Sequence, residues 1–394
     1  MKIVQINTTC GIGSTGKICV DISKLLSARG VENYILFSDK TNGYELGIRC
    51  SDRKYIRLQA VKSRLFGNYG LNSGKATRKM ISELERIKPD IVHLHNIHGH
   101  DCHLEILFHY FKEKNTKLIW TFHDCWAFTG YCPHFTMMKC DKWKSGCSAC
   151  VQRAQYSWLF DRSRTLFEKK KALFSGLDMT IVTPSHWLAD EVKQSFLKDI
   201  PVRVIHNGID PDVFYPISGG FRKKYGIPQN KKILLGVAFD WKPRKGLDVF
   251  LELAVRLPPE NYQIVLVGTN NDVDQCLPRN IISIHRTQNA SNLAEIYSAS
   301  DLFVNPTREE NFPTVNMEAL ACGTPVLTFD TGGSPEVIDE SCGSVVACDD
   351  VVALEKEIIR ICTETPYSEA ACVARAGSFD KNEKYLEYAD LYCI

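Results

Sequence analysis

Strand-like and helix-like segments alternate along most of the chain, and this series starts twice. In the first half, nearly continuous runs of Val, Ile, Leu and Phe predict strands at 2–7, 33–39, 90–96, 117–124 and 179–185. In the second half, similar runs predict strands at 231–239, 262–268, 281–286, 301–307 and 324–331. Strands of this composition are typical of parallel sheets that helices cover on both faces. The sequence therefore predicts two doubly wound α/β domains in tandem.

The overall composition supports a soluble protein with two domains. A chain of 394 residues is too long for one ordinary core, and its 44% hydrophobic and 24% charged residues are typical of globular proteins. The net charge of +2 does not indicate a nucleic-acid partner. The N-terminal MKIVQINTTC contains no signal peptide, and no apolar run reaches the roughly 18 residues of a membrane span. We therefore expect a cytoplasmic protein.

A glycine-rich loop, CGIGSTGKI at residues 10–18, follows the first predicted strand. Its glycines fit the dinucleotide-binding pattern G-x-G-x-x-G, and Asp39 after the second strand is a candidate for the ribose-binding acid. The loop also resembles a P-loop, but Ile18 stands where that motif needs Ser or Thr to hold Mg²⁺. A close-packed turn without any ligand needs glycine too. The loop alone therefore leaves NAD binding and a structural turn open. The glycines concerned are Gly11, Gly13 and Gly16.

A motif region in the second half is more specific. Residues 303–338, FVNPTREENFPTVNMEALACGTPVLTFDTGGSPEVI, contain Glu310 and Glu318, then a helix-like segment, an apolar strand and a Gly-Gly turn. This region resembles the donor-binding segment of retaining GT-B glycosyltransferases, particularly glycosyltransferase family 4. The segments KPRKGLDVFLEL (242–253) and HNGIDPDVF (206–214) follow the order of that family. The resemblance covers almost the whole chain and argues against a dehydrogenase or an ATPase.

The resemblance implies an α/β GT-B fold of two Rossmann-like domains that face a central cleft. Residues 1–206 are expected to form an acceptor-binding domain with a cysteine-rich insertion at 125–150. Residues 207–375 are expected to bind a nucleoside-diphosphate sugar. The segment 376–394 is expected to form a helix that returns to the first domain.

The donor site that the resemblance implies lies mainly in the second domain. Glu310 would bind hydroxyls of the transferred sugar and Glu318 those of the ribose, because carboxylates accept hydrogen bonds from adjacent hydroxyls. Lys245 would stabilise the leaving phosphate. A helix starting near Thr314 would direct its positive end toward the diphosphate.

One position departs from the pattern of many relatives. Val237 stands where they carry an arginine that serves as a second phosphate clamp. Lys242 and Arg244, in the basic loop that follows, are the candidate substitutes. The remaining donor contacts implied by the resemblance are Gly13, Gly16, Asn311 and Phe312.

In the first domain, the resemblance places His123 near the transferred sugar, at the end of a predicted strand. Asp124 follows it, and His95 with Asn96 ends the preceding strand. Open α/β sheets bind ligands at the carboxyl ends of their strands. Asp124, His95 and Asn96 are therefore expected on the acceptor side. Histidines at strand ends are more often structural than catalytic, so the histidine run at 93–98 is weak evidence for a metal. The expected catalytic residues are His123, Glu310 and Lys245.

The family resemblance implies transfer with retention of anomeric configuration and without a catalytic metal or cofactor. A double displacement would need a carboxylate nucleophile, and none is identifiable, so front-face transfer is expected. Two D-x-D triplets, at 210–212 and 272–274, lie in predicted connecting loops and are interpreted as chance. The alternatives are a sugar-nucleotide-using synthase, phosphorylase or epimerase on the same fold, and a catalytically silent binding module.

The insertion at 125–150 is rich in cysteine. Its C-x2-C end is typical of a structural zinc knuckle, and a reducing cytosol favours metal ligands or free thiols over disulfides. The irregular earlier spacings leave free thiols as an equal alternative to structural zinc. The insertion resembles a subgroup of family 4 enzymes that build colanic-acid-like capsules and exopolysaccharides. The candidate zinc ligands are Cys132, Cys140, Cys147 and Cys150.

Two basic amphipathic stretches, at 54–66 and 158–174, suggest a contact with anionic lipid. Leu58, Val61 and Leu65 form one apolar stripe in the first stretch. Ordinary domain helices with a solvated face have the same pattern. Because the expected acceptor is a saccharide, in this family often lipid-linked, the protein could act peripherally on the inner face of the membrane. The basic residues expected to face that membrane are Arg57, Lys62, Lys170 and Lys171.

Overall fold

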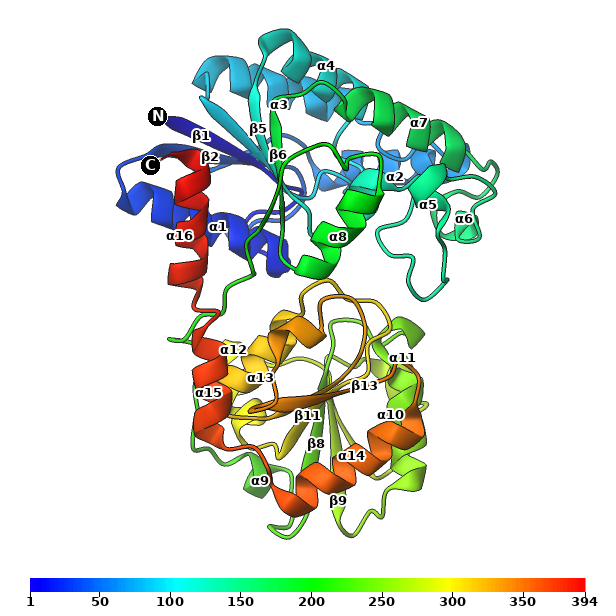
Figure 1. Ribbon diagram of the computed structural model, residues 1–394, viewed down its shortest axis with the longest axis vertical. Helices are drawn as coiled ribbons and strands as arrows, with labels where there is room; N and C mark the ends of the chain where they lie inside the picture. Colours follow the sequence, from blue (N-terminus) through cyan, green and yellow to red (C-terminus); the bar gives the residue numbers. More distant parts are fainter. Residues whose placement is uncertain (394) are drawn as a thin grey trace. The chain divides into compact units, whose positions relative to one another are not determined.

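The computed structural model describes residues 1–393, which divide into two compact units (Figure 1). Unit 1 contains Met1–His206 together with the chain from Lys384 onward, and unit 2 contains Asn207–Glu383. Each unit is built on one parallel β-sheet with covering helices, which confirms the predicted fold class. Among the described residues, no helix is long and apolar enough to span a bilayer.

The sheet of unit 1 has seven parallel strands in the order β3-β2-β1-β4-β5-β6-β7. Their bounds are β1 (Lys2–Ile6), β2 (Glu32–Phe37), β3 (Gly47–Arg49), β4 (Ile91–Leu94), β5 (Lys117–Thr121), β6 (Met179–Thr183) and β7 (Val202–Val204). All five strands predicted for this half are confirmed. The sequence analysis missed β3 and β7, which are three-residue strands at the two edges of the sheet.

The sheet of unit 2 has six parallel strands in the order β10-β9-β8-β11-β12-β13. Their bounds are β8 (Lys232–Val237), β9 (Tyr262–Val267), β10 (Ile281–Ile284), β11 (Leu302–Asn305), β12 (Val326–Phe329) and β13 (Gly343–Val346). The five predicted strands are again confirmed, and the edge strand β13 was missed. This strand has four residues and begins with glycine, so it lacks the long apolar run on which the prediction relied.

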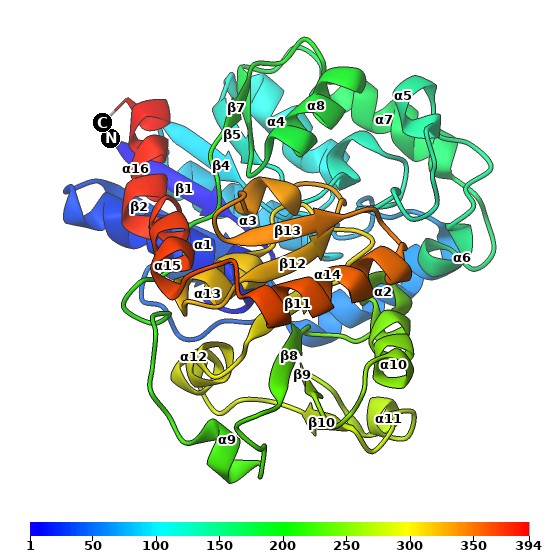
Figure 2. The same cartoon turned by 60° about the horizontal axis from the view of Figure 1, so that its bottom comes forward.

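Helices connect most of the successive strands in both units. The helices of unit 1 are α1 (Gly13–Ala28), α2 (Arg53–Phe66), α3 (Gly74–Ile87), α4 (Leu104–Lys114), α5 (Lys142–Ser145), α6 (Arg153–Tyr156), α7 (Ser163–Phe174) and α8 (His186–Gln194), with the 3-10 turn η1 (Trp126–Phe128). Unit 2 contains α9 (Phe221–Lys224), α10 (Leu247–Arg256), α11 (Asn271–Asp274), α12 (Ala290–Ser298), α13 (Thr314–Ala321), α14 (Val351–Glu364) and α15 (Glu369–Gly377), with η2 (Pro243–Lys245) and η3 (Pro335–Val337). Figure 2 shows the same elements from a second direction.

In each sheet the strand order reverses beside the first strand. Strands β2 and β4 flank β1 in unit 1, and β9 and β11 flank β8 in unit 2. The connections on the two sides of such a point lead to opposite faces of the sheet, which opens a crevice at the carboxyl ends of the central strands. Each unit therefore has one topological switch point, where ligands of open α/β sheets bind.

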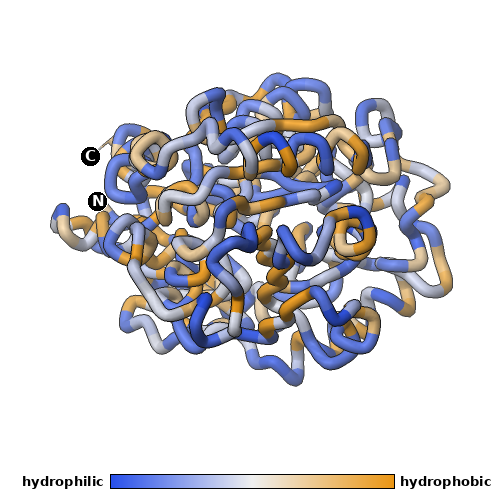
Figure 3. The backbone as a smooth tube through the Cα atoms, turned by 90° about the horizontal axis from the view of Figure 1, so that it is seen from below, coloured by the Kyte–Doolittle hydropathy of each residue, from blue (hydrophilic) through white to orange (hydrophobic). Residues whose placement is uncertain are grey.

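Apolar side chains of the strands form the cores of both units. Figure 3 shows hydrophobic and hydrophilic segments alternating along the chain. In β1, the side chains of Ile3, Val4 and Ile6 are all buried, and in β8 those of Ile233, Leu234 and Leu235 are buried as well. Burial on both faces explains why these strands read as continuous apolar runs.

The last helix, α16 (Lys381–Tyr392), contributes buried tyrosines to unit 1. The Tyr392 hydroxyl lies 2.6 Å from His93 Nδ1, and the Tyr388 hydroxyl lies 3.0 Å from Thr121 Oγ1. Thr121 Oγ1 also lies 2.8 Å from His93 Nε2. Helix α16 therefore completes a buried polar network with β4 and β5.

The cysteine-rich segment packs around large aromatic side chains. Trp126, Phe128, Tyr131 and Trp143 are buried in the core of unit 1. They contact one another and their neighbours in a series of ring contacts, including Phe128 with Trp143 at 5.2 Å between centroids. These contacts fix a segment that contains little regular secondary structure.

Lys170 corrects the basic face predicted for 158–174. Its side chain is buried on α7, and its Nζ donates to the carbonyl oxygens of Trp126 at 2.6 Å and Thr129 at 3.0 Å. The same Nζ lies 3.6 Å from the centroid of a Trp126 ring. Burial lowers the pKa of Lys170 to about 7. This lysine stabilises the segment that contains Trp126 and Thr129, and it cannot face a membrane.

The four candidate zinc ligands lie in the same segment. Cys132 and Cys147 are buried, and the Gly130 N–H donates to Cys147 Sγ at 3.2 Å. Burial raises the pKa of Cys132 to about 12 and that of Cys147 to about 11. Within residues 1–393, no three of the four cysteines have sulfurs mutually within 4.8 Å. The zinc site therefore stays a prediction.

Replacing Lys170 with Met should lower the free energy of unfolding by about 2 kcal/mol, because two buried carbonyl oxygens lose their hydrogen-bond donor. Urea denaturation would measure this change. Lys171→Met is the matched control, because its exposed side chain should change stability by less than about 0.5 kcal/mol. Equal stability of the two variants would contradict the supporting role of Lys170.

We predict about one zinc per chain when the reduced protein is analysed by elemental analysis, because four thiolates suffice to bind zinc tetrahedrally. Cys132→Ser combined with Cys147→Ser should abolish this zinc. The control replaces two exposed cysteines outside the segment, Cys276 and Cys348, and should keep the metal. Zinc absent from the reduced wild-type protein would leave the segment with free thiols.

Candidate active site

In unit 2, two loops lie side by side at the switch point. The basic turn η2 follows β8, and residues 306–313 follow β11. A Cβ atom on Gly246, which has φ +74°, would lie 2.4 Å from the Pro306 carbonyl oxygen. The Arg308 N–H donates to the Arg244 carbonyl oxygen at 2.9 Å. Glycine thus permits a close approach that brings the basic turn to the second loop.

Lys245 and Glu310 form an ion pair across these loops. Their side chains are 19% and 18% exposed, so the pair is sheltered but open to ligand. The Asn311 N–H also lies 3.3 Å from Glu310 Oε1. The two residues that the sequence analysis assigned to phosphate and to sugar therefore lie together at the switch point of unit 2.

Arg308 holds this loop pair in place, and the sequence analysis missed it. Its guanidinium donates two hydrogen bonds to Asp248, at 2.8 and 2.7 Å, and another to Asp349 at 2.5 Å. It also donates to the Pro243 carbonyl oxygen. The hydrogen bonds that Arg308 donates to Asp248 and Asp349 raise its pKa, and its side chain is only 12% exposed. Arg308 is therefore occupied as a structural clamp beneath Lys245.

The helix expected near Thr314 is confirmed as α13, with Pro313 as its N-cap. Buried side chains anchor its first turn. The amide of Asn305 donates to Asn316 Oδ1 at 2.8 Å, and Asn316 Nδ2 donates to Ser334 Oγ at 3.1 Å. This network joins the helix to β11 and to the Gly-Gly turn, so the backbone N–H groups at its N-terminus have a fixed direction.

Glu318 lies on α13, and its carboxylate accepts a hydrogen bond from the Tyr297 hydroxyl at 3.1 Å. Burial, followed by the charge of Glu318, raises the pKa of Tyr297, so the hydroxyl keeps its proton and donates. Tyr297 on α12 was not identified from the sequence. Its contact fixes one carboxylate oxygen of Glu318.

The candidate substitutes for a second phosphate clamp are arranged differently from each other. Lys242 is exposed and forms an ion pair with Asp240 at 2.6 Å. The guanidinium of Arg244 donates to the Glu309 carbonyl oxygen at 3.2 Å. Neither contact involves the Lys245–Glu310 pair, and Val237 ends β8. Both side chains would have to leave these partners to reach a phosphate there.

In unit 1, the predicted residues gather at the carboxyl ends of β1, β4 and β5. His95 Nδ1 lies 3.1 Å from His123 Nε2, and the two rings stack. The Asn96 N–H donates to Asn7 Oδ1 at 3.1 Å. Gln5 on β1, which was not predicted, lies 3.1 Å from His95 Nε2 through its side-chain oxygen. The switch point of unit 1 thus contains a connected polar network.

The ionisation of this network is set by burial. Burial lowers the pKa of His123 to about 4 and that of His93 to about 3, and it lowers the pKa of His95 as well. Burial opposes ionisation of Asp124, but the neighbouring His98 ring, 2.9 Å away, lowers the pKa of this carboxyl to about 2. Near neutral pH the histidines at 93, 95 and 123 are therefore neutral, and Asp124 is charged.

The glycine-rich loop lies beside this network. Gly11 and Gly13 have φ near +70°, and a Cβ atom on Gly16 would lie 2.7 Å from Thr9 Oγ1. Helix α1 begins at Gly13, and its N-cap, Ile12, makes no side-chain cap. The loop therefore needs glycine for its own geometry and leaves the first N–H groups of α1 without a side-chain partner.

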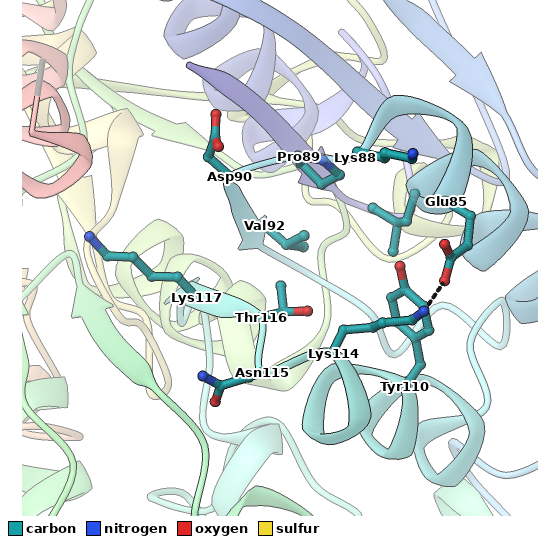
Figure 4. A pocket seen from close by; sticks show the side chains of 11 residues that line it. Glu85, Lys88, Pro89, Asp90, Val92, Tyr110, Lys114, Asn115, Thr116 and Lys117 are labelled. Carbon is teal, nitrogen blue, oxygen red and sulfur yellow. Dashed lines mark ion pairs between the residues drawn. The ribbon is translucent and has the colours of Figure 1, made fainter.

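A separate pocket lies at the amino ends of β4 and β5, away from the switch point (Figure 4). Asp90, Lys117 and Tyr110 line it, and Lys114 forms an ion pair with Glu85 at 3.0 Å. None of the predicted site residues lines this pocket. The candidate site is therefore the network at the carboxyl ends of the strands, in each unit.

Known protein families match both halves of the chain. The model of Glycosyltransferase Family 4 matches residues 15–213, and that of Glycosyl transferases group 1 matches residues 220–376. The Escherichia coli K12 protein WcaC, assigned as a glycosyl transferase of colanic acid biosynthesis, is 24% identical over 100% of this chain and 99% of its own. A D-inositol 3-phosphate glycosyltransferase of Mycolicibacterium smegmatis is 30% identical over 38% of this chain and 37% of its own.

Solved structures with low sequence identity share the fold. Sucrose-phosphate synthase from Thermosynechococcus elongatus has a TM-score of 0.73 at 19% identity, covering 99% of this chain and 98% of its own. Anabaena HepE in complex with UDP-glucose has a TM-score of 0.70 at 14% identity, covering 100% of this chain and 99% of its own. The two Rossmann-like units are thus those of the GT-B class.

The family match agrees with the geometry of the site. The Glycosyltransferase Family 4 model covers half of the chain, and the second model follows it without overlap. The polar groups of both units lie at the switch points of their sheets. The chain belongs to glycosyltransferase family 4.

Proposed function

We propose that this glycosyltransferase moves a hexosyl group from a nucleoside-diphosphate sugar to a saccharide acceptor with retention of configuration. The observation that carries the proposal is the Lys245–Glu310 ion pair at the switch point of unit 2. A diphosphate needs a cation, and a sugar needs a hydrogen-bond acceptor for its hydroxyls. The pair offers both groups in one sheltered place, beside the N-terminus of α13.

Each group of this site has one proposed role in donor binding. When the donor binds, Lys245 would leave its ion pair with Glu310 and contact the diphosphate. Glu310 would then bind hydroxyls of the transferred sugar. Glu318, oriented by Tyr297, would bind the ribose. The N–H groups of Asn311 and the start of α13 would complete the cradle. The relationship to Anabaena HepE, solved with UDP-glucose, supports this donor class.

The proposed chemistry is a front-face transfer. The bond between the anomeric carbon and the phosphate oxygen breaks, and the acceptor oxygen bonds to the same face. The hydroxyl proton of the acceptor passes to the leaving phosphate oxygen. A covalent route would need a free carboxylate nucleophile, and Glu310 is assigned here to the hydroxyls of the transferred sugar. Lys245 would supply the positive charge that stabilises the leaving phosphate, so the reaction needs no metal.

The proposed acceptor is a growing surface polysaccharide, in which the saccharide is linked to a lipid. Similarity to WcaC over the full length of both chains supports this choice. Unit 1 would bind the acceptor at the ends of β4 and β5, where His95, Asn96, His123 and Asp124 lie. Gly13 and Gly16 keep their proposed role in binding the donor.

Exposed apolar side chains support a peripheral membrane contact on unit 1. On α2, Leu58 is 52% exposed, and Val61 and Phe66 are exposed as well. The Trp158 N–H donates to the Arg64 carbonyl oxygen at 2.6 Å, which brings a second exposed segment, residues 158–160, to the end of α2. Exposed basic residues surround both segments, so their proposed partner is an anionic bilayer: Lys54, Arg57, Lys62, Arg64 and Arg162.

Glu310→Gln and Lys245→Met should each lower the rate of transfer by about 10² to 10³, because they remove contacts that strengthen as charge develops on the leaving group. The donor is first selected by thermal shift among UDP-, GDP- and ADP-glucose. Formation of elongated saccharide is then measured at saturating donor. Glu252→Gln, an ion-paired glutamate on the outer side of α10, is the matched control. Near-normal transfer by both site variants would refute the donor site, and hydrolysis without elongation would favour an epimerase-like reaction.

Brief treatment with EDTA should leave the initial rate of transfer unchanged, because Lys245 replaces the metal at the diphosphate. Readdition of Mg²⁺ or Mn²⁺ should not raise the rate. A rate that EDTA abolishes and Mg²⁺ restores would contradict the metal-independent mechanism. The same measurement after prolonged chelation would report on the predicted structural zinc separately, through loss of stability.

Trp158→Ser combined with Phe160→Ser should weaken co-sedimentation with phosphatidylglycerol vesicles at least tenfold, because two large apolar side chains are lost from the contact. Arg57→Ser with Lys62→Ser should weaken it chiefly at low salt. Activity on a soluble acceptor should be unchanged in both variants. Val255→Ser with Val352→Ser, two exposed apolar residues of unit 2, is the control. Equal vesicle binding by all variants would reject this surface.

A further inference from the structure

We infer that Gln5 and His95 position His123 by fixing its tautomer, so that His123 presents a lone pair on Nδ1 to a saccharide hydroxyl. Three buried or half-buried side chains in a row carry this inference: Gln5, His95 and His123. The inference rests on the proposed function only for the identity of the ligand. The tautomer itself follows from which atoms face each other.

The first step fixes the orientation of the Gln5 amide. Gln5 Nε2 lies 2.9 Å from the carbonyl oxygen of Cys19 in α1. A carbonyl oxygen only accepts hydrogen bonds, so the amide nitrogen of Gln5 must face it. The side chain of Gln5 is fully buried, and a flipped amide would bring two acceptors together without water between them. Gln5 therefore turns its oxygen toward His95.

The second step fixes the proton on His95. Its Nε2 lies 3.1 Å from Gln5 Oε1, an atom that only accepts, so Nε2 must carry hydrogen. Burial lowers the pKa of His95, and a neutral imidazole carries one hydrogen. Its Nδ1 is therefore an acceptor. The Trp120 side-chain N–H donates to the His95 carbonyl oxygen at 3.0 Å and so holds the backbone of His95 in place.

The third step reaches His123. Since His95 Nδ1 is an acceptor, His123 Nε2, 3.1 Å away, must be the donor. The neutral His123 ring then has its lone pair on Nδ1. Among the residues that the structure describes, no side chain or backbone group bonds to this atom, and it is not among the buried polar atoms without partners. His123 is half-buried at the carboxyl end of β5, so Nδ1 is open to a ligand that donates a hydrogen bond.

The neighbouring histidine does not compete for this role. Both ring nitrogens of His93 are occupied, by Tyr392 and by Thr121. Its ring lies 4.0 Å from that of His95 between centroids, so a charge on either ring would be unfavourable for the other. The packing thus keeps the Gln5–His95–His123 row neutral. A hydroxyl is the ligand group that suits a neutral nitrogen acceptor in a saccharide site.

The direct test is ¹⁵N NMR of protein labelled at histidine, with His123 assigned from the spectrum of His123→Ala. The wild-type protein should show hydrogen on His123 Nε2 and none on Nδ1 at pH 7. Gln5→Leu removes the acceptor that holds His95, and His123 should then become a mixture of both tautomers. The control is Asn33→Leu, which removes a buried amide at the amino end of β2 and should leave the His123 signals unchanged.

A conservative variant protects the test against misfolding. In Gln5→Glu, a buried carboxyl group is neutral, so its O–H donates to the Cys19 carbonyl and its other oxygen accepts from His95. We expect the wild-type tautomer of His123 in this variant. Wild-type protein with hydrogen on His123 Nδ1, or a Gln5→Leu spectrum identical to wild type, would overturn the inference.

Transfer kinetics test whether the lone pair is used. With the donor chosen by thermal shift, His123→Ala should lower kcat/KM about tenfold, the loss expected for one ligand hydrogen bond. Gln5→Leu should lower it by the factor by which the tautomer with hydrogen on Nε2 is depleted, about twofold for an equal mixture. In the His123→Ala background, the same substitution should have no further effect, because Gln5 acts through His123. Additive losses would overturn the positioning role. The NMR result on the tautomer does not depend on enzymatic activity. Absence of transfer would therefore refute the proposed function, but not the hydrogen-bonded chain from Gln5 through His95 to His123.

Discussion

The reversal of strand order beside β1 and beside β8 is the constraint on which both candidate sites depend. Parallel strands need crossover connections, and these connections are almost always right-handed. Once the order reverses, the loops on its two sides leave toward opposite faces and the carboxyl ends between them stay uncovered. The predicted donor residues lie at such a place or on the helix that starts there, as do His95 and Asn96. His123 and Asp124 lie at the end of the adjacent strand β5. The chemistry of each unit thus follows from its topology.

Much of this fold could be predicted from the sequence, because buried parallel strands leave a clear apolar signal. The nine interior strands and the edge strand β10 have that signal, whereas the edge strands β3, β7 and β13 do not. These edge strands pair with one neighbour and need few apolar residues. The burial of Lys170, in contrast, could not be predicted from the sequence. Its burial depends on two loop carbonyls more than 40 residues earlier in the chain, and a helical pattern gives no sign of them.

The site was predictable to the same extent. Lys245, Glu310 and Glu318 lie in motifs that are read along the chain, and the structure places them at one switch point. Arg308 and Gln5 were missed because their roles arise from partners 60 and 90 residues away, Asp248 and His95. Spacing identifies groups that could contact a ligand. Groups that hold them in position become visible only when distant segments are brought together.

The buried tyrosines of α16 have a consequence for how the chain matures. His93 and Thr121 lie in the first third of the sequence, yet their buried partners, Tyr392 and Tyr388, belong to its last residues. During translation, the sheet of unit 1 leaves the ribosome long before those hydroxyls do. All of unit 2 is synthesised in the interval. Unit 1 therefore begins first but is completed only after unit 2, and the polar groups of its sheet lack their partners until α16 has been made.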